Sequence, residues 1–270
     1  MTERTLPNPG FGTYRLEGDT LKQSINAALD AGYRHIDTAQ FYGNEETVGE
    51  VLRDSSVPRG DIFLTTKVWF DRLEPSDLKQ SVDESLSKLK TEYVDLLLIH
   101  WPSPNDDVPM RDYLSALKEV KAEGKARHIG VSNFTIAQLD QAVEILGKGE
   151  ILTNQIEVHP FLQNRKLVEH CQNLGIQVTG FMPLAVGKVM EDPVLKQIAG
   201  VHGVTPAEIT MAWLKARDIV TIPSSTKQRN IESNFKAFDI ELTEAEMADI
   251  ATLDRGERIA NPDMAPKWDE

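Results

Sequence analysis

The sequence predicts an α/β protein in which residues 1–270 form a single domain, a (β/α)8 barrel. Short apolar or β-branched runs alternate with longer amphipathic stretches along the whole chain, as in repeated parallel βα units. The alternative, a doubly wound open sheet, favours a G-x-G-x-x-G turn if it binds a dinucleotide. Gly10 and Gly12 have the first spacing of that turn, but the third glycine is missing. Polar groups end strand after strand, as active-site residues do in a barrel.

Eight runs of apolar and β-branched residues are predicted as strands because each is short and bounded by turn or helix signals. They are Phe11–Thr13, Arg34–Asp37, Ile62–Lys67, Tyr93–His100, His128–Ser132, Leu152–Glu157, Ile176–Met182 and Ile219–Pro223. The amphipathic stretches between them are predicted as helices. These are Thr20–Ala31, Asn44–Arg53, Ser76–Lys90, Arg111–Glu123, Ile136–Leu146, Lys166–Asn173, Val194–Val201, Pro206–Ala216 and Ile231–Phe238.

The ends of several helices carry their usual signals. Gly32, Gly124 and Gly175 follow helical stretches at points where a left-handed residue ends a helix well. Pro206 stands behind Thr205, which fits a proline in the first turn after a capping hydroxyl. These local signals support the boundaries of the predicted units.

The charge and cysteine content limit the possible partners. The chain has 29 basic and 42 acidic residues, a net charge of −13, which argues against nucleic acid or an anionic membrane as partner. Its single cysteine, Cys171, cannot form an internal disulfide, which fits a reducing compartment. Met1–Gly10 lacks the apolar core of a signal peptide, and the longest strongly apolar run, Leu96–Ile99, is far too short for a membrane span. We expect a cytoplasmic protein.

Four candidate catalytic residues fall at or near the ends of the first strands: Asp37, Tyr42, Lys67 and His100. In a barrel these side chains meet at one rim. A lysine paired with an aspartate is expected to lower the pKa of a neighbouring tyrosine, which makes Tyr42 a proton donor near neutral pH. His100 can hydrogen-bond a carbonyl oxygen. The set is suited to protonating a developing alkoxide and holds no evident nucleophile, so we expect a cofactor to supply the hydride or electrons.

Other interpretations of the same residues remain open at this point. Alone, Asp37 could cap a helix, Tyr42 could be a rim aromatic, and His100 could be a core histidine. A Schiff-base aldolase would use Lys67 as its nucleophile. A non-catalytic nicotinamide-sensing subunit is a further alternative. A metal-dependent hydrolase is disfavoured because the six histidines include no H-x-H or H-E-x-x-H spacing, and we predict no metal site.

Six linked motifs make the chain resemble the aldo-keto reductase family over essentially its whole length. They are Gly32-Tyr33-Arg34-His35-Ile36-Asp37-Thr38-Ala39 with Tyr42-Gly43-Asn44-Glu45, Thr65-Thr66-Lys67-Val68-Trp69, Leu98-Ile99-His100-Trp101-Pro102, Gly130-Val131-Ser132-Asn133-Phe134, and Asn154-Gln155-Ile156-Glu157. The resemblance implies NADPH-dependent reduction of small aldehydes and ketones to alcohols. Bacterial members acting on 2,5-diketo-D-gluconate and methylglyoxal-like aldehydes are the most similar in pattern.

The resemblance also implies roles for individual residues. Tyr42 is the general acid, Lys67 and Asp37 lower its pKa, and His100 orients the substrate carbonyl. The nicotinamide carboxamide is expected to meet three polar side chains, and the nicotinamide ring is expected to stack on an aromatic one. These are Ser132, Asn133 and Gln155 for the carboxamide, and Phe181 for the ring. In isolation, Ser132 and Asn133 could instead cap the helix that follows them.

The cofactor phosphates are expected near the last strands, at Pro183–Lys188 and Pro223–Asn230. Lys227 and Arg229 stand at a helix N-terminus, where cations are disfavoured unless an anion binds there. The 2′-phosphate of NADPH is the natural candidate. The family usually has lysine and arginine where this chain has Ser224 and Asn230, which leaves use of NADH open. The full set of expected cofactor residues is Gly12, Thr13, Tyr14, Asp37, Ser132, Asn133, Gln155, Phe181, Pro183, Leu184, Ser224, Ser225, Thr226, Lys227, Arg229 and Asn234.

The substrate pocket is expected to be comparatively open, because the segment after His100 is short and the chain ends soon after Leu253. Such a pocket suits a small polar carbonyl compound. Its expected walls are Tyr14, Trp69, His100 and Trp101, with Phe70 and Trp268 as further candidates. No stretch is typical of an oligomerisation element, so we expect a monomer.

Overall fold

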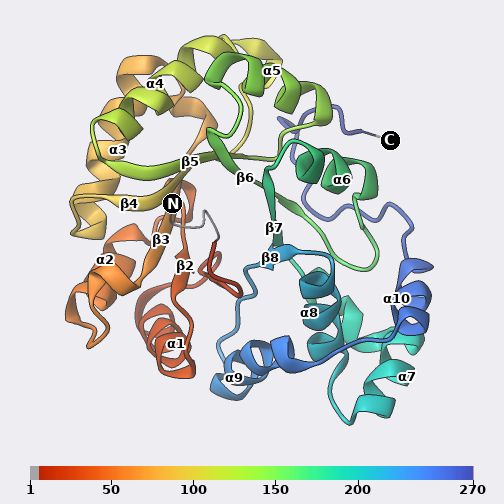
Figure 1. Ribbon diagram of the computed structural model, residues 1–270. Helices are drawn as coiled ribbons and strands as arrows, with labels where there is room; N and C mark the ends of the chain where they lie inside the picture. The colour runs from red at the N-terminus through yellow and green to blue at the C-terminus, as the bar shows by residue number, and fades with distance from the viewer. Residues whose placement is uncertain (1–5, 270) are drawn as a thin grey trace.

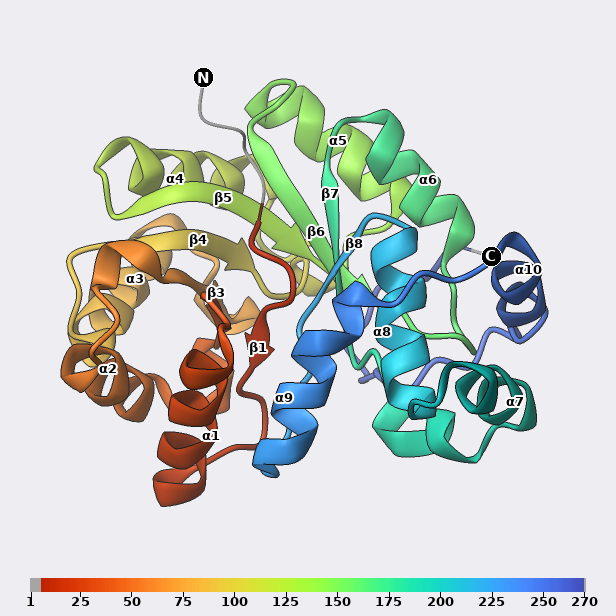
Figure 2. The same cartoon turned by 60° about the horizontal axis from the view of Figure 1, so that its bottom comes forward.

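The computed structural model describes residues 6–269 and shows a barrel of parallel strands surrounded by helices (Figures 1 and 2). Residues 1–5 of the segment Met1–Gly10 lie outside this description. The strands follow one another around the sheet in chain order. They are β1 (Phe11–Gly12), β2 (His35–Asp37), β3 (Phe63–Val68), β4 (Val94–Ile99), β5 (Ala126–Ser132), β6 (Ile151–Glu157), β7 (Gln177–Phe181) and β8 (Ile219–Thr221). The predicted fold class is confirmed.

Backbone hydrogen bonds join the first and last strands of this sheet. The amide of Gly10 donates to the carbonyl of Thr221 at 2.8 Å, and that of Gly12 donates to Pro223 at 3.0 Å. A Cβ on Gly12 would lie 2.7 Å from the carbonyl oxygen of Ile222, so glycine permits this close approach. The barrel therefore closes on one of its shortest elements, the two-residue strand β1.

The helices lie outside the barrel. They are α1 (Gly18–Ala31), α2 (Glu45–Asp54), α3 (Pro75–Leu89), α4 (Met110–Ala122), α5 (Ile136–Leu146), α6 (Arg165–Asn173), α7 (Pro193–His202), α8 (Pro206–Ala216), α9 (Gln228–Lys236) and α10 (Glu244–Ala251). Short 3-10 segments occur at η1 (Gln40–Tyr42), η2 (Arg59–Asp61), η3 (Phe70–Arg72), η4 (Pro104–Asp106), η5 (Ala185–Glu191) and η6 (Ala237–Asp239).

Most helix-end signals are confirmed, and two helices differ from expectation. Thr205 forms a capping box with Glu208, and Gly32 adopts a left-handed conformation after α1. Helix α9 begins before the predicted Ile231, because its first turn contains no apolar residue from which periodicity could be recognised. Helix α10 was not predicted, although Thr243 opens it with another capping box.

Strand periodicity sends alternate side chains into the barrel and out toward the helices. On β4, Leu96 and Leu98 belong to the small apolar cluster inside the barrel, whereas Leu97 and Ile99 pack with the large outer core. His100 follows Leu98 on the inward side. This alternation places the polar residue at the strand end over the barrel mouth rather than against a helix.

Among residues 6–269, no helix is both long and apolar enough to cross a membrane.

Candidate active site

Asp37, Tyr42 and Lys67 form one buried, hydrogen-bonded group at the carboxyl ends of β2 and β3. The Lys67 ammonium lies 2.5 Å from Asp37 Oδ1 and also donates to the Thr38 carbonyl at 2.9 Å and to the Tyr42 hydroxyl at 3.1 Å. The Lys67 side chain is completely buried. A buried ammonium requires such a set of acceptors, so the three partners account for a lysine at this position.

Neighbouring residues fix the position of Tyr42. The Gln40 amide nitrogen donates to the hydroxyls of Ser81 and Ser85 on α3, and its oxygen accepts from the amide of Trp69. Gly43 ends η1 in a left-handed conformation with φ 66°. Asn44 is buried and donates to the carbonyl of Thr13. The turn that carries Tyr42 is thus tied to α3, to β3 and to the segment after β1.

The pKa of Tyr42 is raised above 10.0, which contradicts the prediction that Lys67 lowers it below the ordinary value. Burial raises this pKa, and the charge of Lys67 lowers it by a smaller amount. Burial by itself would lower the pKa of Lys67, but the charge of Asp37 and the hydrogen bonds to Asp37 and Tyr42 contribute to raising it overall. At neutral pH the tyrosine therefore carries its proton, and the lysine beside it is charged.

His100 completes the group from β4. Its ring centroid lies 5.7 Å from that of Tyr42 and 5.0 Å from that of Trp69, in edge-to-face contacts. Burial, with a further contribution from the Lys67 charge, holds the pKa of His100 well below 6.5. Its Nδ1 atom is buried and has no partner among the described residues. The imidazole is therefore neutral at pH 7.

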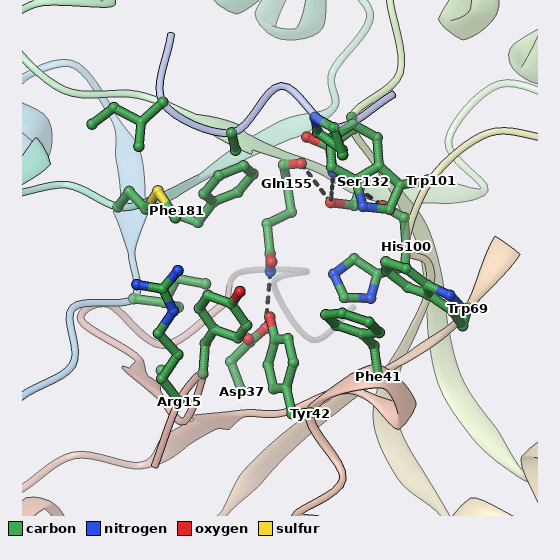
Figure 3. Close-up of a pocket in the computed structure, with 18 of the residues that line it drawn as sticks. Arg15, Asp37, Phe41, Tyr42, Trp69, His100, Trp101, Ser132, Gln155 and Phe181 are labelled. Atoms are coloured by element: carbon green, nitrogen blue, oxygen red, sulfur yellow. Dashed lines mark hydrogen bonds between the residues drawn. The ribbon is translucent and has the colours of Figure 1, made fainter. Parts of the chain in front are cut away.

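These residues open onto a cavity of about 830 Å³ at the carboxyl end of the barrel (Figure 3). Strand ends, the turns after them and the C-terminal segment all contribute to its wall. The cavity is lined by Gly12, Tyr14, Arg15, Asp37, Phe41, Tyr42, Trp69, Phe70, His100, Trp101, Ser132, Asn133, Gln155, Phe181, Met182, Val186, Ile222, Ser224, Ile259, Ala260, Asn261, Pro262 and Met264. Three of the four candidate catalytic residues, Asp37, Tyr42 and His100, border the cavity directly, and Lys67 is buried behind them.

Ser132, Gln155 and Phe181 lie across this cavity from Tyr42 (Figure 3), and Asn133, next to Ser132 in the chain, also lines the cavity. Asn133 donates to the His100 carbonyl at 3.0 Å and to Ser132 Oγ at 3.1 Å, and its Oδ1 atom is buried without a partner among residues 6–269. Neither Ser132 nor Asn133 caps α5, because Thr135 does so in a capping box. Their helix-cap interpretation is wrong.

Gln155 connects this side of the cavity to the catalytic group. Its Nε2 atom donates to Asp37 Oδ2 at 2.9 Å, and its backbone carbonyl accepts from Ser132 Oγ at 2.8 Å. The contact with Asp37 was not foreseen. Asp37 thus accepts one hydrogen bond on each oxygen, from Lys67 and from Gln155, which fixes the orientation of its carboxylate.

Of the two segments expected around the cofactor phosphates, Pro183–Lys188 and Pro223–Asn230, the residues that border the cavity are Val186 and Ser224. Ser225, Thr226, Lys227 and Arg229 follow Ser224 at the N-terminus of α9, and Lys227 and Arg229 are exposed. The other members of the expected set that lie away from the cavity wall are Thr13, Pro183, Leu184 and Asn234. Thr13 is buried, and its hydroxyl donates to the Asp37 carbonyl at 2.9 Å.

Several residues that line the cavity were not predicted from the sequence. The cavity is also less open than expected on the side of the C-terminal segment. Phe41 stacks on Trp69 at 4.0 Å, but nothing in the local pattern distinguishes it from an ordinary surface aromatic. Residues 259–262 and Met264 form part of the wall, so the C-terminal segment does cover the cavity. Trp268 does not line it. Instead, Trp268 packs edge-to-face on Trp101, which does.

Comparison with known proteins gives a consistent result. The model of the Aldo/keto reductase family matches residues 10–255. Methylglyoxal reductase DkgB of Escherichia coli O157:H7 is 47% identical over 265 residues, covering 98% of this chain and 99% of its own. Glyoxal reductase of Bacillus subtilis (strain 168) is 38% identical over 262 residues, covering 96% of this chain and 93% of its own.

A solved structure described as a putative 2,5-diketo-D-gluconic acid reductase B has a TM-score of 0.95 and 44% identity to this chain. The alignment covers 99% of this chain and 95% of that one. The family predicted from six motifs is therefore confirmed by sequence and by structure. This chain belongs to the aldo/keto reductase family and is an oxidoreductase that acts on carbonyl compounds.

Proposed function

We propose that this enzyme uses NADPH to reduce small aldehydes and ketones, methylglyoxal among them, to alcohols, with Tyr42 as the general acid. The observation that carries the proposal is the convergence of Tyr42 and His100 on one cavity, with Lys67 held behind the Tyr42 hydroxyl. Relatives named methylglyoxal reductase and glyoxal reductase support this substrate class.

The residues across the cavity fit a nicotinamide. A carboxamide needs both hydrogen-bond acceptors and donors, and the buried Asn133 Oδ1 is an acceptor that lacks a described partner. Ser132 and Gln155 border the cavity beside it, and Phe181 offers a flat, half-buried ring. Asn133, Ser132 and Gln155 would hold the carboxamide, and Phe181 would contact the ring. When bound, the reduced nicotinamide supplies a hydride to the substrate carbonyl carbon.

The protein's own residues would orient the substrate carbonyl and donate the proton that its oxygen receives. His100, neutral and without a partner at Nδ1 among residues 6–269, would donate from Nε2 to the carbonyl oxygen and orient it. Tyr42 would give its hydroxyl proton to that oxygen as negative charge develops on it. Lys67, 3.1 Å from the tyrosine oxygen, stabilises the phenolate that results. Asp37, fixed by Gln155, keeps Lys67 charged and in place.

The same contacts count against a Schiff-base aldolase. A nucleophilic lysine needs an unprotonated amine with access to substrate. Lys67 is completely buried, and its pKa is raised through its interactions with Asp37 and Tyr42 despite the opposing effect of burial. Lys67 therefore acts through Tyr42 rather than on the substrate.

The preference for NADPH rests on the N-terminus of α9. Lys227 and Arg229 are both exposed there, and neither forms an ion pair with another residue in the range 6–269, although the protein is acidic. The free backbone amides at a helix N-terminus and two cations together attract an anion. Ser224 connects this end of α9 to the cavity, so the 2′-phosphate of NADPH is the anion proposed for it.

We expect methylglyoxal reduction to be faster with NADPH than with NADH at equal, subsaturating concentration. Replacing Arg229 by alanine should raise the KM for NADPH about tenfold, since a hydrogen bond to a charged group contributes roughly 1.5–3 kcal/mol. The KM for NADH should not change. Initial rates of nicotinamide oxidation measure both. Equal rates with the two cofactors, and equal effects of Arg229→Ala on them, would contradict the phosphate assignment while leaving the chemistry intact.

We expect kcat/KM for carbonyl reduction to be nearly constant from pH 6.5 to pH 10.0. These limits are the ordinary pKa values of histidine and of tyrosine. The active form has neutral His100 and protonated Tyr42. Burial lowers the pKa of the first and raises that of the second, so activity falls only below and above this window. Stopped-flow rates at saturating NADPH across this pH range test the prediction. A fall centred near pH 6.5 would show that His100 titrates normally.

A further inference from the structure

Glu157 is a buried carboxylate that the proposed chemistry does not use. It ends β6, is fully buried, and does not line the cavity. Its Oε1 atom accepts hydrogen bonds from the amide of Ile259 and from His159 Nε2, both at 2.8 Å, and its Oε2 atom accepts from the amide of Ala260 at 2.7 Å. Through Glu157, β6 thus accepts hydrogen bonds from the backbone of a segment about a hundred residues later in the chain.

The loop after Glu157 also makes hydrogen bonds to this late segment, at residues 255–258. The carbonyl of Phe161 accepts from the amides of Arg255, at 3.2 Å, and Glu257, at 3.0 Å. Asn164 donates to the Glu157 carbonyl at 2.7 Å and accepts from Arg258 at 3.3 Å. These contacts are made by residues 255, 257, 258, 259 and 260, and the two to Glu157 are the last of them before the residues that continue the cavity wall.

The segment held in this way becomes a wall of the cavity. Ile259 and Ala260, the two residues whose amides Glu157 accepts, border the cavity, and Asn261, Pro262 and Met264 continue the wall. Figure 3 shows this segment as the blue ribbon at the top of the view, with Tyr42 at the bottom and Gln155 and Phe181 between them. A substrate whose carbonyl lies at Tyr42 reaches this wall only if it extends across the cavity.

We propose that Glu157 is a positioning residue that tethers residues 259–264 as the far wall of the substrate pocket, and thereby sets how well the enzyme binds longer carbonyl substrates. The inference rests on the proposed reduction of carbonyls at Tyr42. A carboxylate suits this place because it accepts on both oxygens and donates on neither. An amide of the same shape would turn an N–H toward the amide of Ile259 or of Ala260, and one backbone donor would lose its acceptor.

The test uses Glu157→Gln in the full chain, with methylglyoxal as the short substrate and 2,5-diketo-D-gluconate as the long one. Because a loosened wall misplaces only the substrate that touches it, the KM of the long substrate should rise roughly tenfold. The kcat and KM for methylglyoxal and the Kd for NADPH should remain within about twofold of wild type. If both substrates are affected equally, or neither is, the proposed role in discrimination is wrong.

Asp95→Asn provides a matched control. Asp95 is also a buried acid that accepts a backbone amide, that of Leu64 at 3.0 Å, and it is paired with Arg59 and Arg127. It lies near the start of β4, away from the cavity. Asp95→Asn and Glu157→Gln should both lower the unfolding midpoint, but Asp95→Asn should not change the KM ratio of the two substrates. An equal change in that ratio would mean that lost stability alone explains the effect.

Hydrogen exchange of the backbone amides tests the tether without turnover. The amides of Ile259 and Ala260 should be protected at least tenfold more than those of exposed loop residues, and Glu157→Gln should remove this protection while β6 stays protected. Free exchange at both amides in the wild type would overturn the tether. Failure of the wild type to reduce either substrate would overturn the proposed function, and with it the role in discrimination, while exchange would still decide the tether.

Discussion

Tyr42→Phe is expected to lower kcat for methylglyoxal reduction by about 10²–10⁴-fold, the usual contribution of a general acid. The substitution removes the one hydroxyl that lies both 3.1 Å from Lys67 and at the cavity wall. The ring remains, so its contacts with Tyr14 at 5.0 Å and with His100 at 5.7 Å are kept. The Kd for NADPH, measured by quenching of protein fluorescence, should stay within about twofold of wild type.

Tyr113→Phe is a suitable control for this experiment. It also removes a buried tyrosine hydroxyl, but Tyr113 lies on α4 and does not border the cavity. Its turnover should equal that of the wild type. If Tyr42→Phe retained most of the wild-type kcat, Tyr42 would not be the proton donor, and His100 would become the remaining candidate at the substrate carbonyl.

Lys67→Met is expected to destabilise the fold by about 3–5 kcal/mol, the usual effect of removing one partner of a buried ion pair. Asp37 is buried, and without Lys67 the hydrogen bond from Gln155 would be its one remaining side-chain partner among residues 6–269. The double variant Lys67→Met with Asp37→Asn should recover more than half of this loss, because it leaves no unpaired buried charge. Urea unfolding followed by circular dichroism measures the difference.

Activity separates the structural and chemical roles of the pair. Both variants lack the charge beside the Tyr42 hydroxyl, so both should reduce methylglyoxal far more slowly than the wild type, even where stability is recovered. If the double variant were as unstable as Lys67→Met, loss of packing rather than the unpaired carboxylate would explain the result. If it regained turnover, Lys67 would have no part in proton transfer.

The local sequence was sufficient to predict the fold and to locate the candidate catalytic residues at the strand ends. Alternation of short apolar runs and amphipathic stretches is a property of neighbouring residues, so the eight strands could be placed without knowing their partners. Period-two alternation then sends Lys67 and His100 inward at the ends of β3 and β4. The predictions were weaker where a helix begins with polar residues, as α9 does, because no apolar periodicity marks its first turn.

Interactions between distant residues could not be predicted in this way. The pKa of Tyr42 was predicted in the wrong direction, because its sign depends on burial outweighing the charge of Lys67, and burial is a property of the assembled barrel. The hydrogen bond from Gln155 to Asp37 joins residues 118 positions apart. The wall formed by residues 259–264 depends in the same way on Glu157.

The sequence by itself therefore determined the barrel, through local periodicity, and the family, through its motifs, and the residue types at the strand ends supplied the candidate reacting side chains. Only the tertiary structure decided which charges are shielded from water, which acceptors are left open, and which late segment closes the cavity. Those properties arise when strands and loops from distant parts of the chain pack together, and no local pattern encodes that packing.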